Sequence, residues 1–257
     1  MPSNQIVEQL VRLSNNLGQP EHDYVILGEG NTSARVDDQT FWVKASGTEL
    51  RTITAGGFVQ VSFERAQTML DGRALSDQEV KDALTATKAV PEAPGHPSVE
   101  TLLHAQLLCL GDVNFVGHTH PTAINALTCS KAFPSIFRGR IFPDEIVLCG
   151  VAPLLVPYTD PGLPLARRVQ NLLRDHMNEY GEAPRIIIMQ NHGLIVLGRT
   201  AKQVEDVSAM AVKTARVLLG ACSAGGPRYL TLKNVERIHT RLDEVYRRQQ
   251  LGLGKKD

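Results

Sequence analysis

The chain has 257 residues, of which 42% are hydrophobic, and its 27 basic and 27 acidic residues give a formal net charge of zero. Because no basic run could follow a phosphate backbone, we expect no nucleic-acid partner. The first residues lack the layout of a signal peptide, and no apolar run approaches the roughly 18 residues that span a bilayer, so we expect no membrane association and a cytoplasmic location.

The N-terminal part has the pattern of one helix followed by a β-meander. Apolar residues recur at helical spacing between Asn4 and Gly18, and Gly18 is suited to cap the helix. Four short β-like segments follow, with turn-forming residues between them and little room for crossover helices. We therefore predict an antiparallel meander with strands at 24–28, 33–38, 40–46 and 57–63.

The rest of the chain mixes helical and strand-like segments. No internal repeat or long Pro/Gly/Ser-rich linker interrupts it, so we predict a single α/β domain over residues 1–257, built as a sheet covered by helices. Ser98 is interpreted as the N-cap of a helix, and Pro121 as the start of another. The further expected strands are 113–118, 151–157, 185–190 and 193–197, and the expected helices are 63–70, 76–89, 98–110, 164–179, 201–220 and 231–249.

The cysteines are far apart and form no C-x-x-C pair. Three of them lie within or beside apolar segments, so we interpret all four as reduced packing residues, with a lone reactive thiol as the alternative. The four are Cys109, Cys129, Cys149 and Cys222.

The segment "FVGHTHPTA" places two histidines one residue apart at the end of a predicted strand. Residues i and i+2 of a strand point to the same face, so His118 and His120 are expected to project side by side. Two neutral imidazoles in this arrangement can bind one metal ion. The alternative is one histidine hydrogen-bonded in the core and one exposed histidine.

A third histidine interrupts the apolar segment "RIIIMQNHGLIVLG". This pattern is typical of two strands joined by a tight turn, with His192 in the turn. An unpaired buried polar group costs about 1–3 kcal/mol, so His192 needs either a metal ion or a hydrogen-bond partner such as the backbone.

The segment "PSVETLLHAQLL" adds a carboxylate, Glu100, in the first turn of a predicted helix. The helix dipole favours a carboxylate there, whether it serves as a capping aid or as an acid/base. His104 lies one helical turn further on. We interpret it as a packing residue or as a partner of the site residues rather than as a metal ligand.

Five motifs occur in the order "GEGNTSARV", "KASGTEL", "PSVET", "GHTHP" and "QNHGLIVLG", and together they span about 170 of the 257 residues. In this order they resemble the class II aldolase/adducin family, which includes fuculose- and rhamnulose-phosphate aldolases, ribulose-phosphate 4-epimerase and related decarboxylases. The resemblance implies a three-layer α/β/α fold with a largely antiparallel central sheet. It also implies a homotetramer with sites at the subunit interfaces.

The resemblance implies a metal site and its chemistry. His118, His120 and His192 match the family's zinc ligands, and Glu100 matches its proton-transferring acid; Mn²⁺ or Co²⁺ would also suit nitrogen ligands. The implied activity is that of a carbon–carbon lyase of carbohydrate metabolism, which cleaves a sugar phosphate or related hydroxy-keto substrate through a metal-stabilised enediolate. The alternatives are a decarboxylase, a 4-epimerase or a dehydratase on the same site, or a non-enzymatic adducin-like assembly domain. The presence of all three histidines and Glu100 argues against an assembly domain, which would not need them.

An anion pocket for the substrate is also implied by the resemblance. Backbone N–H groups in turns and at a helix start can bind a phosphate, although these segments alone would be interpreted as tight hairpin turns. Lys44 either adds positive charge or is a solvated strand-edge residue. The matching positions are Gly30, Asn31, Thr32, Ser46, Gly47, Thr48 and Ser98.

Two departures leave the substrate open. Phosphate-binding relatives carry two serines before the glutamate, whereas Val99 follows Ser98 here. They also borrow a tyrosine from a neighbouring subunit, and the comparable stretch "AFPSIFRGRIF" offers Phe137 and Arg138 instead. Arg138 or Arg140 is a candidate contact for a carboxylate or phosphate, with a solvated loop as the alternative.

The segment "IFPDEIVLCGVAPLLVPYTDPGLPLARRV" looks closer to the aldolase portion of rhamnulose-phosphate aldolase/dehydrogenase fusions than to the short fuculose enzymes, although no dehydrogenase half is expected here. Within it, Tyr158 and Asp160 are candidates to lie near the site of this or an adjacent subunit. The alternative is that they only shape a turn.

Overall fold

The computed structural model describes residues 3–73 and 75–253, and these form one seven-stranded sheet. The strand order is β3-β2-β1-β4-β7-β6-β5, and only β5 and β6 pair in parallel. The expected meander corresponds to β1, β2 and β3, and the largely antiparallel sheet is confirmed. The strands are β1 (Asn31–Arg35), β2 (Thr40–Lys44), β3 (Phe58–Ser62), β4 (Phe115–Thr119), β5 (Leu154–Val156), β6 (Ile186–Met189) and β7 (Gly193–Gly198).

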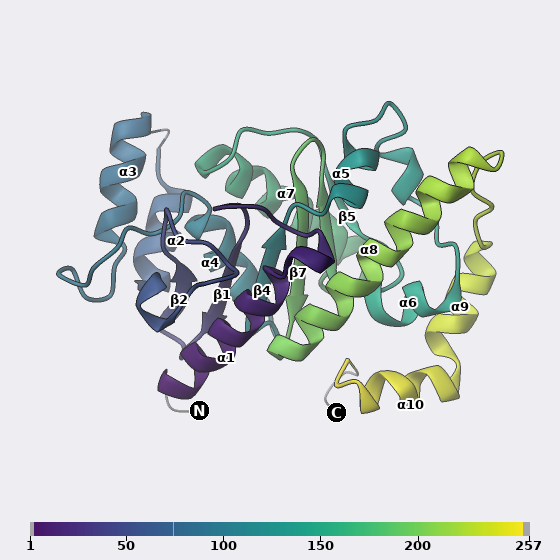
Figure 1. The fold of residues 1–257 in the computed structure, drawn as a ribbon, viewed down its shortest axis with the longest axis horizontal. Coiled ribbons are helices and arrows are strands. Elements are labelled where there is room, and N and C mark those ends of the chain that lie inside the picture. The colour runs from purple at the N-terminus through teal and green to yellow at the C-terminus, as the bar shows by residue number, and fades with distance from the viewer. Residues whose placement is uncertain (1–2, 74, 254–257) are drawn as a thin grey trace.

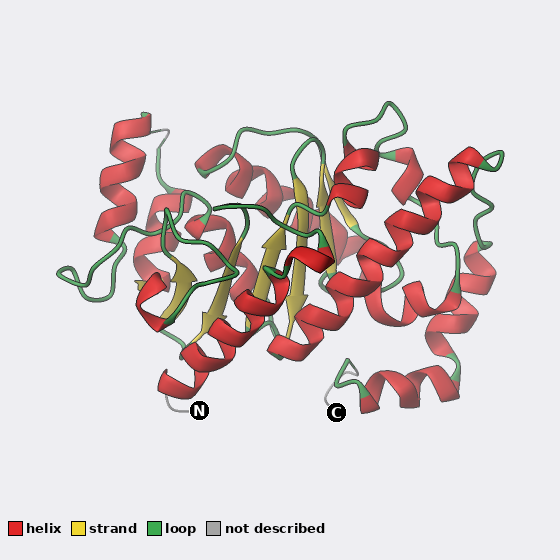
Figure 2. Ribbon diagram, in the orientation of Figure 1, coloured by secondary structure: helices red, strands yellow, loops and turns green. Residues whose placement is uncertain are grey.

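Helices cover both faces of this sheet (Figures 1 and 2). On the face nearer the viewer in Figure 1 lie α1 (Ser3–Leu17), α5 (Thr122–Thr128) and α8 (Ala201–Ser223), and on the other face lie α2 (Phe63–Asp71), α4 (Thr101–Leu108) and α7 (Leu163–Tyr180). Strand residues alternate between the two cores: Ile186 and Ile188 face one, while Ile187 faces the other. The three-layer α/β/α architecture is thereby confirmed.

The remaining helices lie beside these layers. They are α3 (Asp77–Ala86), α6 (Pro143–Cys149), α9 (Leu232–Thr240) and α10 (Leu242–Gln250), with short 3₁₀ turns η1 (Pro20–His22), η2 (Ala55–Gly57) and η3 (Ser135–Phe137). Both α9 and α10 contact α6. In the described part of the chain, no helix combines the length and the apolar character that crossing a membrane requires.

The predicted strand at 24–28 is wrong. Leu27 has a φ of 50°, which breaks an extended backbone, and the N–H of Glu29 donates to the carbonyl of Ile26 to close a turn. Ile26 and Leu27 are 65% and 77% exposed. The apolar run therefore reflects a surface loop beside the site rather than a strand.

Several predicted helix boundaries also differ. The helix expected at 231–249 is two helices, because Arg241 has a ψ of 134° between them. The helix expected at 76–89 ends at Ala86, and α6 was not predicted because its seven residues are too few to show a clear period. Helix α4 begins at Thr101 rather than at Ser98, and Glu100 occupies its N-cap position. Glu100 is thus placed by the entry into the helix.

The interpretation of all four cysteines as packing residues is correct for Cys149 alone. All four are free thiols in the described part of the chain, but only Cys149 is buried, and burial raises its pKa to about 12. Cys109, Cys129 and Cys222 are exposed because each lies on the outward side or at the end of a helix.

Candidate metal centre

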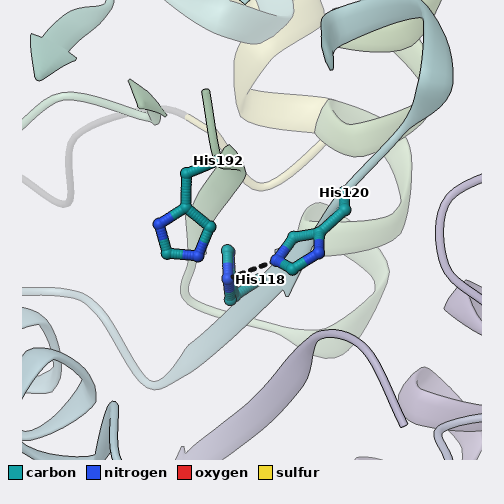
Figure 3. Close-up of side chains that lie close together, drawn as sticks. All are labelled: His118, His120 and His192. Carbon is teal, nitrogen blue, oxygen red and sulfur yellow. Dashed lines mark hydrogen bonds between the residues drawn. The ribbon is translucent and has the colours of Figure 1, made fainter. Parts of the chain in front are cut away.

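Three histidines meet where β4 and β7 lie side by side. His118 belongs to β4, His120 follows that strand directly, and His192 lies in the turn between β6 and β7. Their ring centroids are 4.7 to 5.2 Å apart, and Figure 3 shows the three rings turned toward one another. One ligand atom from each lies within 4.8 Å of the others, so the group could hold a metal ion.

The turn that presents His192 depends on two neighbours. Asn191 has a φ of 53°, a left-handed conformation that asparagine tolerates well. A Cβ on Gly193 would lie 2.5 Å from the carbonyl oxygen of Thr119 and 2.7 Å from Cδ2 of His120. Glycine at this position therefore lets the turn approach the end of β4 closely enough for the rings to meet.

The ring orientations direct one nitrogen of each histidine inward. Nδ1 of His118 lies 3.0 Å from the carbonyl oxygen of Leu194, so the proton is on Nδ1 and Nε2 is free. Nε2 of His118 lies 3.0 Å from Nε2 of His120. The carboxylate of Glu100 completes the cluster, with Oε2 at 3.3 Å from Nε2 of His118 and Oε1 at 3.2 Å from Nε2 of His192.

This donor set fits a divalent cation. Glu100 is only 6% exposed, and its Oε1 accepts no well-directed hydrogen bond from the described residues. A buried carboxylate oxygen with an imidazole nitrogen nearby but no well-directed hydrogen bond is poorly compensated, and a cation or a substrate group in the space that it faces would stabilise it. Three imidazole nitrogens with a nearby carboxylate form a donor set that zinc and similar divalent ions accept.

The protonation states agree with that use. Burial lowers the pKa of His118 and of His120 to about 4, so both rings are neutral near neutral pH, as metal ligands must be. Burial raises the pKa of Glu100, but the neighbouring His118 and His192 and the hydrogen bond from Asn31 outweigh it, so the net pKa lies below the ordinary range. The site therefore offers two neutral imidazoles, those of His118 and His120, and an ionised carboxylate.

A polar chain along one face of β1 holds Glu100. Nδ2 of Asn31 donates a 2.7 Å hydrogen bond to Oε2 of Glu100, and Oδ1 of Asn31 accepts from Nε2 of His104. The hydroxyl of Ser33 lies 2.6 Å from Nδ1 of His104, and burial lowers the pKa of His104 to about 4, so Ser33 donates to a neutral ring. His104 is a partner of Asn31, in line with its sequence interpretation. Ser33 was missed, although its spacing of two residues from Asn31 placed it on the same face.

The positions expected to bind an anion converge only in part. Nδ2 of Asn31 lies 3.5 Å from the hydroxyl of Ser98, and the N–H of Ser46 donates to the carbonyl of His96, so three segments run together. Because that bond occupies the N–H of Ser46, only its exposed hydroxyl group is left to contact an anion. Gly30 has a φ of 69°, and a Cβ there would lie 2.6 Å from the carbonyl oxygen of His118.

Two other members of this set have different roles. Thr32 is fully buried on the opposite face of β1, where its hydroxyl shares a 2.6 Å hydrogen bond with Ser14 of α1. Its side chain is therefore removed from the anion pocket, because successive strand residues alternate between faces. The hydroxyl of Thr48 donates to the carbonyl of Ala45 and stabilises the turn that carries Gly47, whose φ is 80°.

Lys44 is not the solvated strand-edge residue that one interpretation allowed. It is 3% exposed, and its Nζ donates to the carbonyl of Gly28. Burial lowers its pKa, while Glu100 and Glu49 act in the opposite direction. A buried cation therefore lies near Glu100 and beside the glycine-containing loop.

The remaining candidates lie outside the histidine cluster. Arg140 is buried and pairs with Glu145 at 3.0 Å, so its proposed contact with a substrate is wrong. Arg138 is exposed after η3. Tyr158 is 57% exposed and donates from its hydroxyl to Asp160, while its N–H donates to the side chain of Gln190, two residues before His192.

Two clefts lie near these residues or near the centre. One, of about 650 Å³, is lined by Arg138, Tyr180 and Gln190, among others. The other, of about 350 Å³, is lined by Glu29, His120 and Asn125, among others. The second cleft reaches a candidate metal ligand directly, and the first reaches the turn that carries His192.

Residues 8–219 match the profile of the class II aldolase and adducin N-terminal domain. The chain belongs to this family. The resemblance inferred from the five motifs is thereby confirmed, and members of the family include aldolases, dehydratases and decarboxylases.

Two individual relatives share about 30% of the aligned residues with this class II aldolase family member. It is 30% identical over 204 residues to the uncharacterized oxidoreductase YuxG of Bacillus subtilis, a match that covers 76% of this chain and only 27% of YuxG. The chain thus spans about a quarter of that relative's length. It is 29% identical over 192 residues to methylthioribulose-1-phosphate dehydratase of Geobacillus kaustophilus, covering 70% of this chain and 75% of the dehydratase.

Among solved structures, the fold is similar to the N-terminal class II aldolase domain of a conserved protein from Thermoplasma acidophilum. The TM-score is 0.65 at 28% identity, with 83% of this chain and 93% of that chain covered. This similarity agrees with the three-layer fold described above.

Proposed function

We propose that this class II aldolase family member is a zinc-dependent carbon–carbon lyase that acts on a sugar phosphate or a related hydroxy-keto substrate. The observation that carries the proposal is the convergence of His118, His120 and His192 on the carboxylate of Glu100, at 3.2 and 3.3 Å from two of the imidazoles. An assembly domain without catalysis, the adducin-like alternative, would not need this arrangement.

The three histidines would hold the cation through the ring nitrogens that face one another. A bound divalent cation supplies positive charge that stabilises negative charge on a substrate oxygen. Zinc suits such nitrogen donors with an open position, and Mn²⁺ or Co²⁺ would be alternatives. The neutral state of His118 and His120 near neutral pH supports this assignment.

Glu100 would move the proton. Its Oε2 is held by Asn31, whereas its Oε1 accepts no well-directed hydrogen bond from the described residues and is available for a substrate proton. Because the carboxylate is ionised, it accepts the proton at one step and returns it at the other. Retro-aldol cleavage requires this kind of proton transfer together with stabilised charge on oxygen.

We place the anionic end of the substrate at the junction of the three loop segments. The contacts would come from the turns at Gly30 and Gly47, from the hydroxyl groups of Ser46 and Ser98, and from the amide of Asn31. Buried Lys44 supports this assignment because it brings a positive charge near the same loop. Arg138 and Tyr158 lie outside the histidine cluster. They would contact the other end of the substrate only if it extends to them, or if they reach the site of a neighbouring subunit.

Dehydration is the second candidate, because the chain is 29% identical to a protein named methylthioribulose-1-phosphate dehydratase over 70% of its length. The same site could support it, since both reactions place negative charge on the carbonyl oxygen. Dehydration removes the proton from the carbon beside the carbonyl, whereas retro-aldol cleavage removes the proton of the hydroxyl group and later adds one to that carbon. Decarboxylation and 4-epimerisation use the same activated oxygen and are included in the test below.

The decisive experiment is a substrate panel with zinc-loaded protein. Phosphorylated and free ketoses, aldonates and 3-oxo acids are incubated with it, and products are identified by mass spectrometry, and by NMR where an epimer leaves the mass unchanged. The proposal expects two carbonyl fragments from a ketose phosphate. Water loss from the intact carbon chain would identify a dehydratase instead, and products that form equally well after removal of all metal would overturn the metal-dependent mechanism.

We also propose a homotetramer. The support is that members of this family are often oligomeric. Light scattering would then give about four times the chain mass of 28.1 kDa. A mass of one chain at working concentration would contradict the assembly.

A further inference from the structure

The loop before β1 carries a second carboxylate beside the histidine cluster, that of Glu29. Oε1 of Glu29 lies 3.8 Å from Nδ1 of His120. Its second oxygen, Oε2, accepts a 3.0 Å hydrogen bond from the N–H of Ile26. One oxygen therefore anchors the side chain to the turn of its own loop, and the other is left to face the imidazole.

His120 and His118 are oriented alike. In each ring Nε2 faces the cluster, with 3.0 Å between the two atoms, while Nδ1 faces outward. Nδ1 of His118 lies 3.0 Å from the carbonyl oxygen of Leu194. Nδ1 of His120 faces Oε1 of Glu29 at 3.8 Å, an ion-pair distance from which a small rotation of either side chain would make a hydrogen bond. A histidine that binds a metal through one nitrogen usually donates the other N–H to a carboxylate or carbonyl, which fixes the ring.

The other ionisable groups around this cleft are placed differently. Asp23 lines the same cleft, but its Oδ1 accepts a 2.9 Å hydrogen bond from the hydroxyl of Thr122. Cys129 lies at the cleft wall and is exposed. Of the two carboxylates among the described residues that line this cleft, Asp23 and Glu29, the one that forms an ion pair with His120 is Glu29.

We propose that Glu29 is a positioning residue that holds the His120 ring with its proton on Nδ1 and its Nε2 toward the cation, and so raises the affinity of the site for zinc. The inference rests on the proposed function, because it assigns His120 as a ligand. The inference adds Glu29, in the loop before β1, as a residue that supports a metal ligand without binding the metal itself. The Glu29 side chain is 39% exposed, so its effect is expected on metal affinity and not on folding.

The test measures zinc affinity in metal-depleted protein by competition with a chromophoric chelator. The variants are Glu29→Ala and the isosteric Glu29→Gln, and the matched control is Glu21→Gln, which makes the same charge change at an exposed position in η1. Loss of such a partner typically weakens metal binding about 10- to 100-fold. We expect that loss for Glu29→Ala, a smaller loss for Glu29→Gln and wild-type affinity for Glu21→Gln.

Thermal melting of the metal-free proteins checks that each variant is folded, and Glu29→Gln decides the question if Glu29→Ala does not fold. Wild-type zinc affinity in a folded Glu29 variant would overturn the inference and leave the proposed function standing. An equal loss in Glu21→Gln would also overturn it, because the effect would then be one of net charge. A wild-type protein that binds no zinc would instead overturn the proposed function.

Discussion

Asn31 and Glu100 lie 69 positions apart in the sequence, and a 2.7 Å hydrogen bond joins the amide of the first to the carboxylate of the second. Asn31 also lies opposite His118 in the antiparallel pairing of β1 with β4. The same strand pair therefore positions a candidate metal ligand and the residue that holds the candidate acid/base. Sheet register sets the distance between Asn31 and His118, and the entry into α4 places Glu100 beside them.

Replacing Glu100 by glutamine tests its role in proton transfer. The amide in Glu100→Gln cannot accept the substrate proton, so turnover should fall about 10²- to 10⁴-fold, while the histidines still bind zinc. Initial rates and elemental analysis of the same sample measure both quantities. The exposed Glu8→Gln variant in α1 serves as the control. Turnover at the wild-type level in Glu100→Gln would remove Glu100 as the proton carrier.

Two neighbouring residues of β1 should separate catalysis from stability. Ser33→Ala leaves Nδ1 of His104 without its partner and should lower both kcat and the free energy of unfolding, the latter by about 1–3 kcal/mol. Thr32→Val removes a hydrogen bond to Ser14 on the opposite face and should lower stability alone. Urea unfolding and steady-state kinetics of both variants provide the comparison. Equal kcat in the two variants would show that the chain from Ser33 to Glu100 has no catalytic effect.

Gly193→Ala should disturb the metal centre by a direct clash. Its new Cβ would lie 2.5 Å from the carbonyl oxygen of Thr119 and 2.7 Å from the ring of His120, so the turn or the ring must move. We expect a loss of about 1–3 kcal/mol in stability from overpacking, together with weaker zinc binding. Gly56→Ala is the matched control, because a Cβ there meets nothing within 4 Å. Calorimetric zinc titration should distinguish the two variants, and unchanged binding by Gly193→Ala would contradict the prediction.

The stability of the metal-free protein should fall as the pH drops from about 6.5 toward about 4. His104, His118 and His120 have pKa values lowered from 6.5 to about 4 by burial, so in this window the unfolded chain binds protons that the folded chain does not. Each such histidine contributes a slope of up to about 1.4 kcal/mol per pH unit. The lowered pKa of Glu100 adds to this loss from the unfolded-chain value of 4.5 downward, where the glutamate of the unfolded chain becomes protonated while that of the folded chain does not.

Urea unfolding across this pH range measures the slope, and His104→Gln should reduce it by about one proton. Because His104 is fully buried and lies outside the proposed ligand set, this variant isolates one group. A slope that is the same in the variant and the wild type would show that His104 does not titrate with a lowered pKa.

Local pattern was sufficient for most of the architecture. The helix-period pattern before Gly18, the alternating strands of the meander and the apolar segments around His192 each depend on neighbours in sequence, and all three correspond to observed elements. The pattern failed at 24–28, where apolar residues form an exposed turn, and at Arg241, where one predicted helix becomes two. In both places a backbone conformation that apolar spacing does not encode ends the element.

The sequence by itself determined the family, and it pointed to the three histidines and Glu100 as candidate site residues, because these residues lie in short ordered motifs. Only the tertiary structure decided which side chains support them. The link from Ser33 through His104 and Asn31 to Glu100, the burial of Lys44 and the approach of Glu29 to His120 all join segments far apart in the chain. Such contacts depend on strand register, on the closeness of turns and on which face of a strand is buried, and these are properties of the packed sheet.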